Sequence, residues 1–419
     1  MIDDAAGFGV NKKQEIKRLL YEISKREKIP QKDIIKPLSG SNYHQIKKEL
    51  LKRRYSQAFL AKELVNPYLP KIEHNPSERF NLKNKNFSPK NIFIEEKAVD
   101  SALAERFKSV FKEAKIQKIS SLKDYIKESR RFTIKDYNNR RDKVFIVNEK
   151  HDFFKKCPCT KGAVNCGYHI FNLGFGCIFE CTYCFLQGYT NSPGIILPAN
   201  IDDFFKKFGS YKKPGMCMGT GEFSDSLALD DITEYSKPLV EFFKKNKEVI
   251  FEFKTKSNKI NNLLKSGGAK NIIVSWSLNP QKMIDENEFF TASLKERISS
   301  AQMCVKAGYR VGFHFDPVIY YGNWRADYKS VIENLFDKIK PQDIAWVSLG
   351  TFRFPRELKP VIENRFPRNT ILDAELLPGY DGKLRYPRHI RTDIYNAMQT
   401  MLHRHSRCLN IYLCMEENT

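Results

Sequence analysis

The feature that most constrains this chain is a C-x3-C-x2-C motif in a glycine-bearing loop, directly after an apolar run over residues 168–173. Its cysteines are Cys177, Cys181 and Cys184. Thiolates are the usual protein ligands of iron–sulfur clusters, and a cubane cluster normally takes four protein ligands. Three local thiolates therefore leave one iron open to a ligand that is not protein. The spacing predicts a 4Fe-4S cluster at this loop.

Other uses of these cysteines remain open. Structural zinc sites usually have four ligands, commonly in C-x2-C pairs or with histidines nearby. A non-enzymatic zinc-binding protein is therefore the remote alternative. A disulfide is disfavoured, because the ten cysteines come without a secretory signal after Met1 and indicate reduced thiols in the cytoplasm. No apolar run is long enough to predict a transmembrane helix or a membrane partner.

Strand-like and helix-like segments alternate along the second half of the chain. Short apolar segments of strand length are separated by amphipathic helical patterns, one of which is closed by Gly308 at the position that favours glycine. Such alternation predicts a parallel sheet with right-handed crossovers. The expected strands are residues 168–173, 216–220, 249–253, 272–276, 310–315 and 345–349.

An ordered set of short motifs extends the pattern beyond the cysteines. Together they resemble the radical S-adenosylmethionine (radical SAM) enzymes, and within them the branch of spore photoproduct lyase. The resemblance runs from about residue 91 to the C-terminus, and it implies an α/β fold with a partial (β/α)6 TIM-type barrel and an active site at the C-terminal ends of the strands. The motifs are Cys181-Thr-Tyr-Cys184-Phe-Leu-Gln187, Ser224-Asp225 with Asp230, Phe253-Lys-Thr-Lys256, Trp276-Ser-Leu-Asn279, Ala307-Gly-Tyr-Arg-Val-Gly-Phe313 and Arg353-Phe354.

The resemblance also implies cofactors and their contacts. In this superfamily a reduced cluster passes an electron to SAM, which is cleaved to a 5′-deoxyadenosyl radical, and a reducing protein such as flavodoxin or ferredoxin supplies the electron. Glu222 is expected to receive the SAM amino group, since a carboxylate accepts hydrogen bonds from an ammonium. A solvent-exposed glutamate and a surface lysine are the alternatives at Glu222 and Lys256. The expected SAM-binding residues are Gly219, Gly221, Glu222, Ser224, Lys256, Ser277 and Asn279.

Two positions depart from the lyase pattern. The lyase has a hydrogen-returning cysteine two residues before the serine of its Ser-Asp pair, where this chain has Glu222. The lyase also has tyrosines on both sides of the third cluster cysteine; Tyr183 keeps the first, and Phe185 replaces the second. Cys217 is a substitute donor by position, although a small buried strand cysteine is the alternative. The candidate catalytic residues are therefore Tyr183, Glu222 and Cys217.

A second group of thiols precedes the barrel. Cys157, Cys159 and Cys166 fall within ten residues of one another and are not part of the lyase pattern. An auxiliary cluster or a zinc ion, completed by His151 or His169, is one interpretation. The other is that these thiols bind no metal.

The charge of the chain points to a polyanionic partner. It has 71 Lys and Arg against 49 Asp and Glu, a formal net charge of +22, and cations that neutralise phosphates release counterions. DNA is favoured over RNA. The alternative is a radical SAM enzyme that modifies a peptide or small molecule, with an incidental basic surface. By resemblance, the DNA-contacting residues are Lys383, Arg385, Tyr386 and Arg388 in a late hairpin, with a solvated charged turn as the alternative.

The sequence also suggests a division into parts. Ile16, Leu19, Leu20 and Ile23 mark one face of a basic helix, and either Ser41 or Asn42 is a candidate cap for a second one. We expect a monomer with five segments: a basic helical module over residues 1–65, a linker over 66–90, a small α/β extension over 91–165, the barrel over 166–355, and a C-terminal extension over 356–419. Within the α/β extension we expect a helix from about residue 98 to 115.

Overall fold

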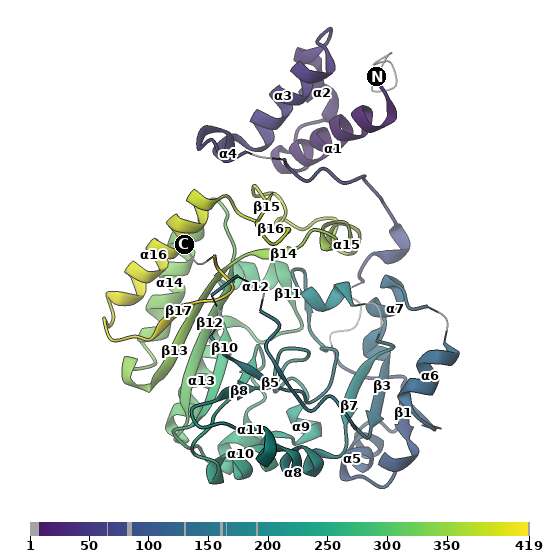
Figure 1. Ribbon diagram of the computed structural model, residues 1–419, viewed down its shortest axis with the longest axis vertical. Helices are drawn as coiled ribbons and strands as arrows, with labels where there is room; N and C mark the ends of the chain where they lie inside the picture. The colour runs from purple at the N-terminus through teal and green to yellow at the C-terminus, as the bar shows by residue number, and fades with distance from the viewer. Residues whose placement is uncertain are drawn as a thin grey trace. The chain divides into compact units, whose positions relative to one another are not determined.

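The chain forms two compact units in the computed structural model, which describes residues 8–64, 66–81, 86–129, 131–159, 162–164, 166–189 and 192–417. The barrel unit comprises Phe80–Val318, Asn323–Gly350 and Ala397–Thr419. The helical unit comprises the described residues up to Arg79, Ile319–Gly322 and Thr351–Asn396. Figure 1 shows the course of the chain through the elements of both units.

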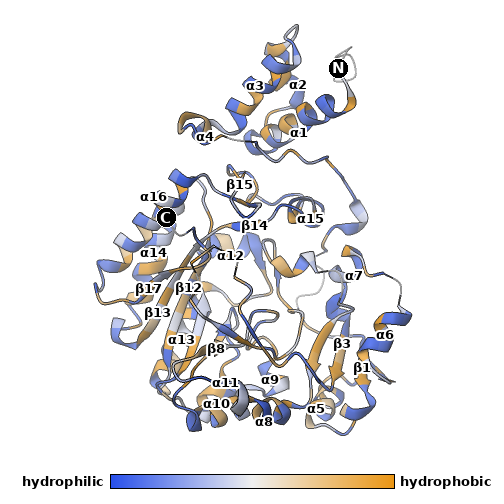
Figure 2. Ribbon diagram, in the orientation of Figure 1, coloured by the Kyte–Doolittle hydropathy of each residue, from blue (hydrophilic) through white to orange (hydrophobic). Residues whose placement is uncertain are grey.

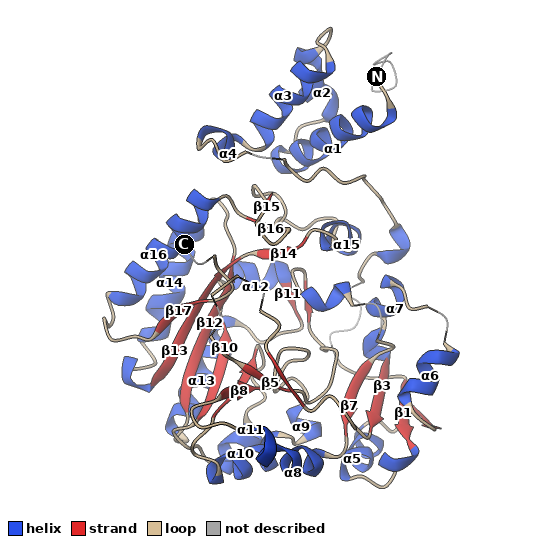
Figure 3. Ribbon diagram, in the orientation of Figure 1, coloured by secondary structure: helices blue, strands red, loops and turns tan. Residues whose placement is uncertain are grey.

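The barrel unit is built on a curled sheet of eight strands in the order β17-β13-β12-β10-β9-β8-β5-β4 (Figure 3). From β5 to β12 the neighbours are parallel, β17 is parallel to β13, and β4 is antiparallel to β5. All six predicted strands are confirmed, and with them the partial barrel. The bounds are β4 (Phe154–Lys156), β5 (His169–Phe171), β8 (Cys217–Gly219), β9 (Ile250–Thr255), β10 (Ile272–Ser277), β12 (Arg310–Val318), β13 (Ile344–Thr351) and β17 (Ile411–Leu413).

Helices occupy the connections between these strands. Helix α13 begins with a capping box between Ser293 and Glu296 and is followed by Gly308 at φ +91°, as its sequence predicts. Phenylalanines join the helices to the sheet: Phe243 stacks on Phe251 at 4.0 Å, and Phe171 on Phe204 at 5.3 Å. The helices are α8 (Ile201–Tyr211), α9 (Asp230–Thr233), α10 (Ser236–Lys245), α11 (Asn261–Ser266), α12 (Gln281–Asn287), α13 (Leu294–Lys306) and α14 (Trp324–Phe336).

Figure 2 shows the outcome of this packing, with apolar residues concentrated along the strands and polar residues on the helices. Apolar side chains of the strands, such as Val274, Trp276 and Phe313, are fully buried. Among the described residues, no helix combines the length and the apolarity that crossing a bilayer would require.

A second, four-stranded sheet in the order β2-β1-β3-β7 belongs to the same unit. The sequence predicts one helix from about residue 98 to 115, which is too long: helix α5 ends at Val110, and Lys115 begins β2, whose residues pair with β1. Strand β7 follows the cysteine loop in sequence and completes this sheet. The elements are β1 (Asn91–Glu95), α5 (Ala102–Val110), β2 (Lys115–Ile119), α6 (Leu122–Glu128), α7 (Ile134–Asn138), β3 (Lys143–Val147) and β7 (Ile195–Pro198).

The helical unit combines the N-terminal helices with the late segment Thr351–Asn396. Of the two predicted caps it is Asn42 that forms a capping box with Gln45 at the start of α3. Leu19, Leu20 and Leu50 form the core of the helices together with Leu377 from the late part of the chain. The elements are α1 (Val10–Glu27), α2 (Gln31–Ile35), α3 (Tyr43–Arg54), α4 (Ser56–Leu60), β14 (Arg353–Pro355), α15 (Leu358–Arg365), β15 (Leu377–Pro378) and β16 (Lys383–Arg385); α16 (Arg388–His403) starts in this unit.

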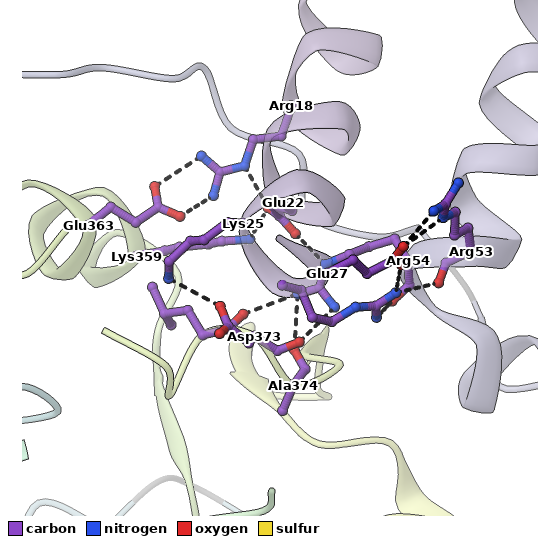
Figure 4. Close-up of polar contacts among 12 residues, drawn as sticks. Arg18, Glu22, Lys25, Glu27, Arg53, Arg54, Lys359, Glu363, Asp373 and Ala374 are labelled. Atoms are coloured by element: carbon purple, nitrogen blue, oxygen red, sulfur yellow. Dashed lines mark hydrogen bonds and ion pairs between the residues drawn. The ribbon is translucent and has the colours of Figure 1, made fainter. Parts of the chain in front are cut away.

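A buried ionic cluster joins these distant segments (Figure 4). The carboxylate of Glu22 accepts hydrogen bonds from Arg18 at 2.6 Å, Arg54 at 2.7 Å and Lys359 at 2.7 Å. Arg18 also pairs with Glu363. The first helices and the segment after β13 therefore share one interior, although the sequence suggests separate segments over 1–65 and 356–419. Those segment limits remain a prediction.

Candidate active site

The cysteine loop follows β5 at the C-terminal edge of the parallel strands. Gly174 and Gly176 have φ values of +111° and +92°, and a Cβ on Gly174 would lie 2.2 Å from the carbonyl oxygen of Ile196. Only glycine fits such a turn. The loop then forms β6 (Glu180–Cys181), which pairs antiparallel with β11 (Glu288–Phe289), so that Cys181 faces Glu288.

Arg140 holds the loop from the side of the smaller sheet. Its Nε donates to the Cys177 carbonyl at 3.0 Å, and its Nη2 donates to the Phe179 carbonyl at 2.7 Å. The guanidinium also pairs with Glu180 and is 3% exposed. A buried charge with these partners fixes the loop that carries all three cysteines.

Cys181 is buried, and Cys177 and Cys184 are half-buried. Burial raises the pKa of Cys177 to about 12 and also raises the pKa values of Cys181 and Cys184. The positive charge of Lys256 acts to lower the pKa values of Cys181 and Cys184. The Phe179 N–H donates to Cys177 Sγ at 3.4 Å. A nearby cation and a backbone donor are the groups that favour thiolates, the form that binds metal.

This donor set fits an iron–sulfur cluster in its chemistry. Among the described residues, no three His, Cys, Asp or Glu side chains are arranged around a single metal ion. A 4Fe-4S cluster is larger than an ion and takes its thiolates on separate irons. Cys177, Cys181 and Cys184 are therefore the residues that could hold such a group, and their ligand role remains a prediction.

The end of β8 lies very close to β9. A Cβ on Gly219 would meet the carbonyl oxygen of Glu252 at 2.2 Å, and one on Gly221, at φ +101°, would meet that of Lys254 at 2.8 Å. Glu222 follows and is half-exposed. Burial opposes the charge of Lys254, but Asp316 and Glu222 outweigh it and raise the Lys254 pKa. Glu222 therefore lies near a half-buried cation at the strand ends.

Asp225 of the Ser-Asp pair connects two strand ends. Its Oδ1 accepts from Thr255 Oγ1 at 2.6 Å and from the backbone of Leu227 and Ala228 at 3.0 and 2.9 Å. Its Oδ2 accepts from the Lys256 backbone N–H at 2.7 Å. The aspartate thus positions Lys256, and the neighbouring Ser224 is half-exposed at the same turn.

The end of β10 meets the cysteine loop through side chains. Asn279 Nδ2 donates to Glu288 Oε1 at 2.8 Å, and Tyr183 donates its hydroxyl proton to the same oxygen. Ser277 is buried, and its carbonyl accepts from Arg297 at 2.8 Å. The structure therefore brings together Tyr183, Ser277 and Asn279, which sequence motifs single out separately.

Lys256 lies at the same place. Its Nζ is 5.8 Å from the centre of the Tyr183 ring. Burial opposes the lysine charge, but the neighbouring Cys181 and Glu288 outweigh this effect and raise the Lys256 pKa. The side chain is half-buried beside the cysteine loop, and its contact with SAM remains a prediction.

The sequence reading missed three residues of this site: Glu288, Arg297 and Tyr328. Glu288 and Arg297 form a fully buried ion pair at 2.6 Å, and Tyr328 donates to Asn279 Oδ1 at 2.6 Å. Each is an ordinary polar residue outside any motif. The pairing of β6 with β11 places Glu288 beside the cysteine loop, and that pairing has no local sequence signal. Arg297 and Tyr328 reach the site from α13 and α14 through their side chains.

Cys217 lies in a different environment. It packs half-buried against a small core of Ile273, Ala345 and Trp346. Burial and the nearby Glu252 raise its pKa. Glu252 itself pairs with His314 at 2.8 Å inside the barrel. These surroundings match the alternative of a core cysteine, and a donor role for Cys217 remains a prediction.

The second thiol group begins directly after β4, beside the N-terminal end of β5. The Cys157 N–H donates to the Tyr168 carbonyl at 2.9 Å, and the Cys159 N–H donates to the Cys157 carbonyl at 2.8 Å. Burial and the nearby Glu222 raise the pKa of Cys157. Cys166 is exposed. Metal binding by this group remains a prediction.

The four predicted nucleic-acid contacts lie in the helical unit. Tyr386 is 1% exposed and accepts from the Tyr320 N–H at 3.0 Å. Arg385 is 3% exposed and pairs with Asp381 at 2.7 Å. Lys383 is half-buried, and Arg388 is exposed. In this arrangement Arg388 and Lys383 are accessible to a phosphate, whereas Arg385 and Tyr386 serve the interior of the unit.

Comparison with known proteins identifies one family. Residues 87–405 match the family model described as spore photoproduct lyase. Spore photoproduct lyase of Clostridium acetobutylicum is 28% identical over 221 residues, covering 51% of this chain and 66% of that protein. The enzyme of Bacillus subtilis strain 168 is 26% identical over 305 residues, covering 69% of this chain and 86% of that protein. The chain thus spans about two thirds or more of these two relatives.

Solved structures show the same fold. A cysteine-to-serine variant of spore photoproduct lyase aligns with a TM-score of 0.65 at 21% identity, over 78% of this chain and 99% of the other. A second variant, with bound AdoMet and dinucleoside spore photoproduct, aligns with a TM-score of 0.64 at 22% identity over the same fractions. The N-terminal helices precede the matched family segment.

Proposed function

The chain belongs to the spore photoproduct lyase family, and from this membership we propose that it is a radical SAM enzyme whose cluster is held by Cys177, Cys181 and Cys184. The observation that carries the proposal is the cysteine loop itself. Its three thiols lie at the C-terminal edge of the parallel strands, with Cys181 buried and Cys177 and Cys184 half-buried, beside the half-buried cation of Lys256. Active sites of barrel enzymes lie at this edge.

When bound and reduced, the 4Fe-4S cluster supplies an electron to SAM, which yields methionine and a 5′-deoxyadenosyl radical. The chain's own residues bind and orient SAM. Gly219 and Gly221 keep the end of β8 close to β9, which lets the backbone approach a ligand. Glu222 accepts hydrogen bonds from the SAM ammonium, and Lys256 pairs with its carboxylate. Ser224, Ser277 and Asn279 complete the SAM contacts.

We propose DNA as the substrate class. One solved relative contains a dinucleoside spore photoproduct, and the net charge of +22 suits a polyanion. Lys383 and Arg388 are the accessible candidates for phosphate contacts. Tyr183, Glu222 and Cys217 are the candidates for hydrogen transfer, and the glutamate and Phe185 distinguish this chain from the lyase pattern. The ten cysteines are free, which suits a reducing compartment such as the cytoplasm.

The first prediction concerns radical generation. After anaerobic reconstitution with iron and sulfide, the protein should be brown and, when reduced by dithionite, flavodoxin or ferredoxin, should form 5′-deoxyadenosine from SAM, measured by chromatography. Cys177→Ala should reduce this product to background, because a cluster ligand is lost. The matched control is Cys408→Ala, an exposed cysteine outside the site, which should retain wild-type product. A colourless, zinc-containing protein that leaves SAM intact would contradict the proposal.

A second arm tests the substrate. Ultraviolet-irradiated DNA should be repaired in a SAM-dependent reaction, and DNA affinity should fall steeply as salt concentration rises. A protein that cleaves SAM but shows no salt-dependent DNA affinity would favour the alternative, a radical SAM enzyme for a peptide or small molecule. The burial of Arg385 and Tyr386 favours that alternative, because buried side chains do not contact DNA.

A further inference from the structure

Glu288 lies opposite the cysteine loop and belongs to none of the sequence motifs. Its backbone is fixed there by strand pairing, since Glu288 faces Cys181 in the β6–β11 ladder. The preceding residue adds two hydrogen bonds: the Thr182 N–H donates to the Asn287 carbonyl at 2.9 Å, and Thr182 Oγ1 donates to Asn287 Oδ1 at 2.8 Å. The position of Glu288 is therefore tied to that of the cysteine loop.

The Glu288 side chain is a common acceptor for three segments of the chain. Oε1 accepts from Tyr183 of the cysteine loop and from Asn279, after β10. Oε2 lies 2.6 Å from Nη2 of Arg297 on α13. The carboxylate is 2% exposed, and a buried carboxylate is stable only with partners of this kind.

Arg297 is itself held in place. Its Nε donates to the Ala292 carbonyl at 2.9 Å, its Nη1 to the Ser277 carbonyl at 2.8 Å, and its Nη2 to Thr291 Oγ1 at 2.7 Å. The guanidinium is fully buried. Glu288 thus neutralises a cation that has no route to solvent, and it does so next to Lys256, whose charge it also favours.

The acceptor character of Glu288 fixes the orientation of Asn279. An ionised carboxylate can only accept hydrogen bonds, so the amide nitrogen of Asn279 must face it. The contact of the amide oxygen is consistent with this orientation, because the Tyr328 hydroxyl donates to Asn279 Oδ1 at 2.6 Å. Nδ2 is committed to Glu288 at 2.8 Å and to Tyr183 at 3.4 Å. What remains for a ligand is the second lone pair of Oδ1.

We propose that Glu288 is a positioning residue that orients Asn279 and Tyr183 so that Asn279 presents its oxygen, as an acceptor, to a donor group of SAM. The inference rests on the proposed function, which assigns Asn279 to SAM. Glu288 itself touches no cofactor in this scheme and acts through its two partners. This orientation is selective for the ligand group. A hydroxyl or amine that donates a hydrogen bond can bind Asn279 Oδ1, whereas a group that can only accept one cannot.

Glu288→Gln tests the proposal, because glutamine keeps the size of the side chain but can donate as well as accept. Asn279 is then able to turn its amide, and the buried Arg297 loses its counter-charge. On reconstituted, unreduced protein, equilibrium dialysis should show a SAM Kd raised about tenfold, the weakening expected for one misplaced polar contact, with unchanged iron content. Glu288→Asp, which remains an acceptor only, should recover part of the affinity.

The matched control is Glu286→Gln, an exposed glutamate two residues earlier in α12, which should keep the wild-type Kd. A Glu288→Gln protein that is less stable to heat but binds SAM as the wild type does would overturn the positioning role. If Glu288→Gln does not fold, Glu288→Asp decides: a raised Kd supports the role, and an unchanged Kd overturns it. A wild-type protein that holds iron but binds no SAM would instead overturn the proposed function.

Discussion

Gly219 shows how a single residue sets the geometry of the site. Because a Cβ there would lie 2.2 Å from the Glu252 carbonyl and 2.3 Å from the Tyr168 hydroxyl, Gly219→Ala should push the end of β8 away from β9. Overpacking of this kind costs about 1–3 kcal/mol. We expect a lower free energy of unfolding in urea and a weaker SAM affinity by equilibrium dialysis.

The control for that prediction is Gly209→Ala in α8. No atom lies within 4 Å of the position that its Cβ would occupy, and alanine is favoured over glycine in a helix by about 0.5–1 kcal/mol. This variant should be as stable as the wild type or more so, with unchanged SAM affinity. An equal loss of stability and of SAM affinity in the two variants would contradict a specific contact at Gly219.

At the scale of elements, the ionic cluster around Glu22 connects α1, α3 and α15. Removing one partner of a buried ion pair costs about 3–5 kcal/mol, because the remaining charges stay buried. Glu22→Gln should therefore lower the free energy of unfolding of the helical unit by about that amount in a urea titration. Glu49→Gln, on an exposed surface pair with Lys52, is the control and should change stability little.

The same cluster predicts a pH dependence. Burial acts to raise the Glu22 pKa, but Lys359, Arg54 and Arg18 outweigh it and lower the pKa well below its usual range. A group whose pKa is lower in the folded state stabilises the fold above its unfolded pKa, and this contribution is lost as pH falls. Stability of the helical unit should thus decline below about pH 4.5, the ordinary glutamate value. Glu22→Gln should weaken this decline; an unchanged profile in circular dichroism would contradict it.

At the scale of the whole molecule, periodicity and spacing were enough to predict the barrel strands and to limit the cap of α3 to Ser41 or Asn42, because such signals are local. They failed where the outcome depends on distant partners. Helix α5 ends early because Lys115–Ile119 find a neighbour in β1. Glu288 enters the site through a short ladder with no motif. Tyr386 resembles a surface aromatic in sequence, yet it packs beside Tyr320 and Phe352.

The helical unit is built from two segments that lie far apart in the sequence, and this leads to a further prediction. A chain that begins at Phe80 lacks α1 and α3, and Lys359 and Glu363 then lose their partners Glu22 and Arg18. Limited proteolysis followed by mass spectrometry should show faster cleavage within residues 351–396 of this shortened chain than in the full chain. Equal protection of the segment in both would contradict a shared interior.

That shared interior also constrains the order of events during protein synthesis. The ribosome delivers α1 and α3 first, but their partners Lys359 and Leu377 belong to the last part of the chain. At roughly 5–20 residues per second, the nascent helices wait on the order of tens of seconds for those partners. During that interval Glu22 has only Arg18 and Arg54 beside it, and the leucines that later meet Leu377 stay uncovered. The barrel strands from β4 to β13 emerge in the meantime, whereas β17 follows Leu377 in the sequence. The sheet from β4 to β13 therefore has the opportunity to form before the N-terminal helices are complete.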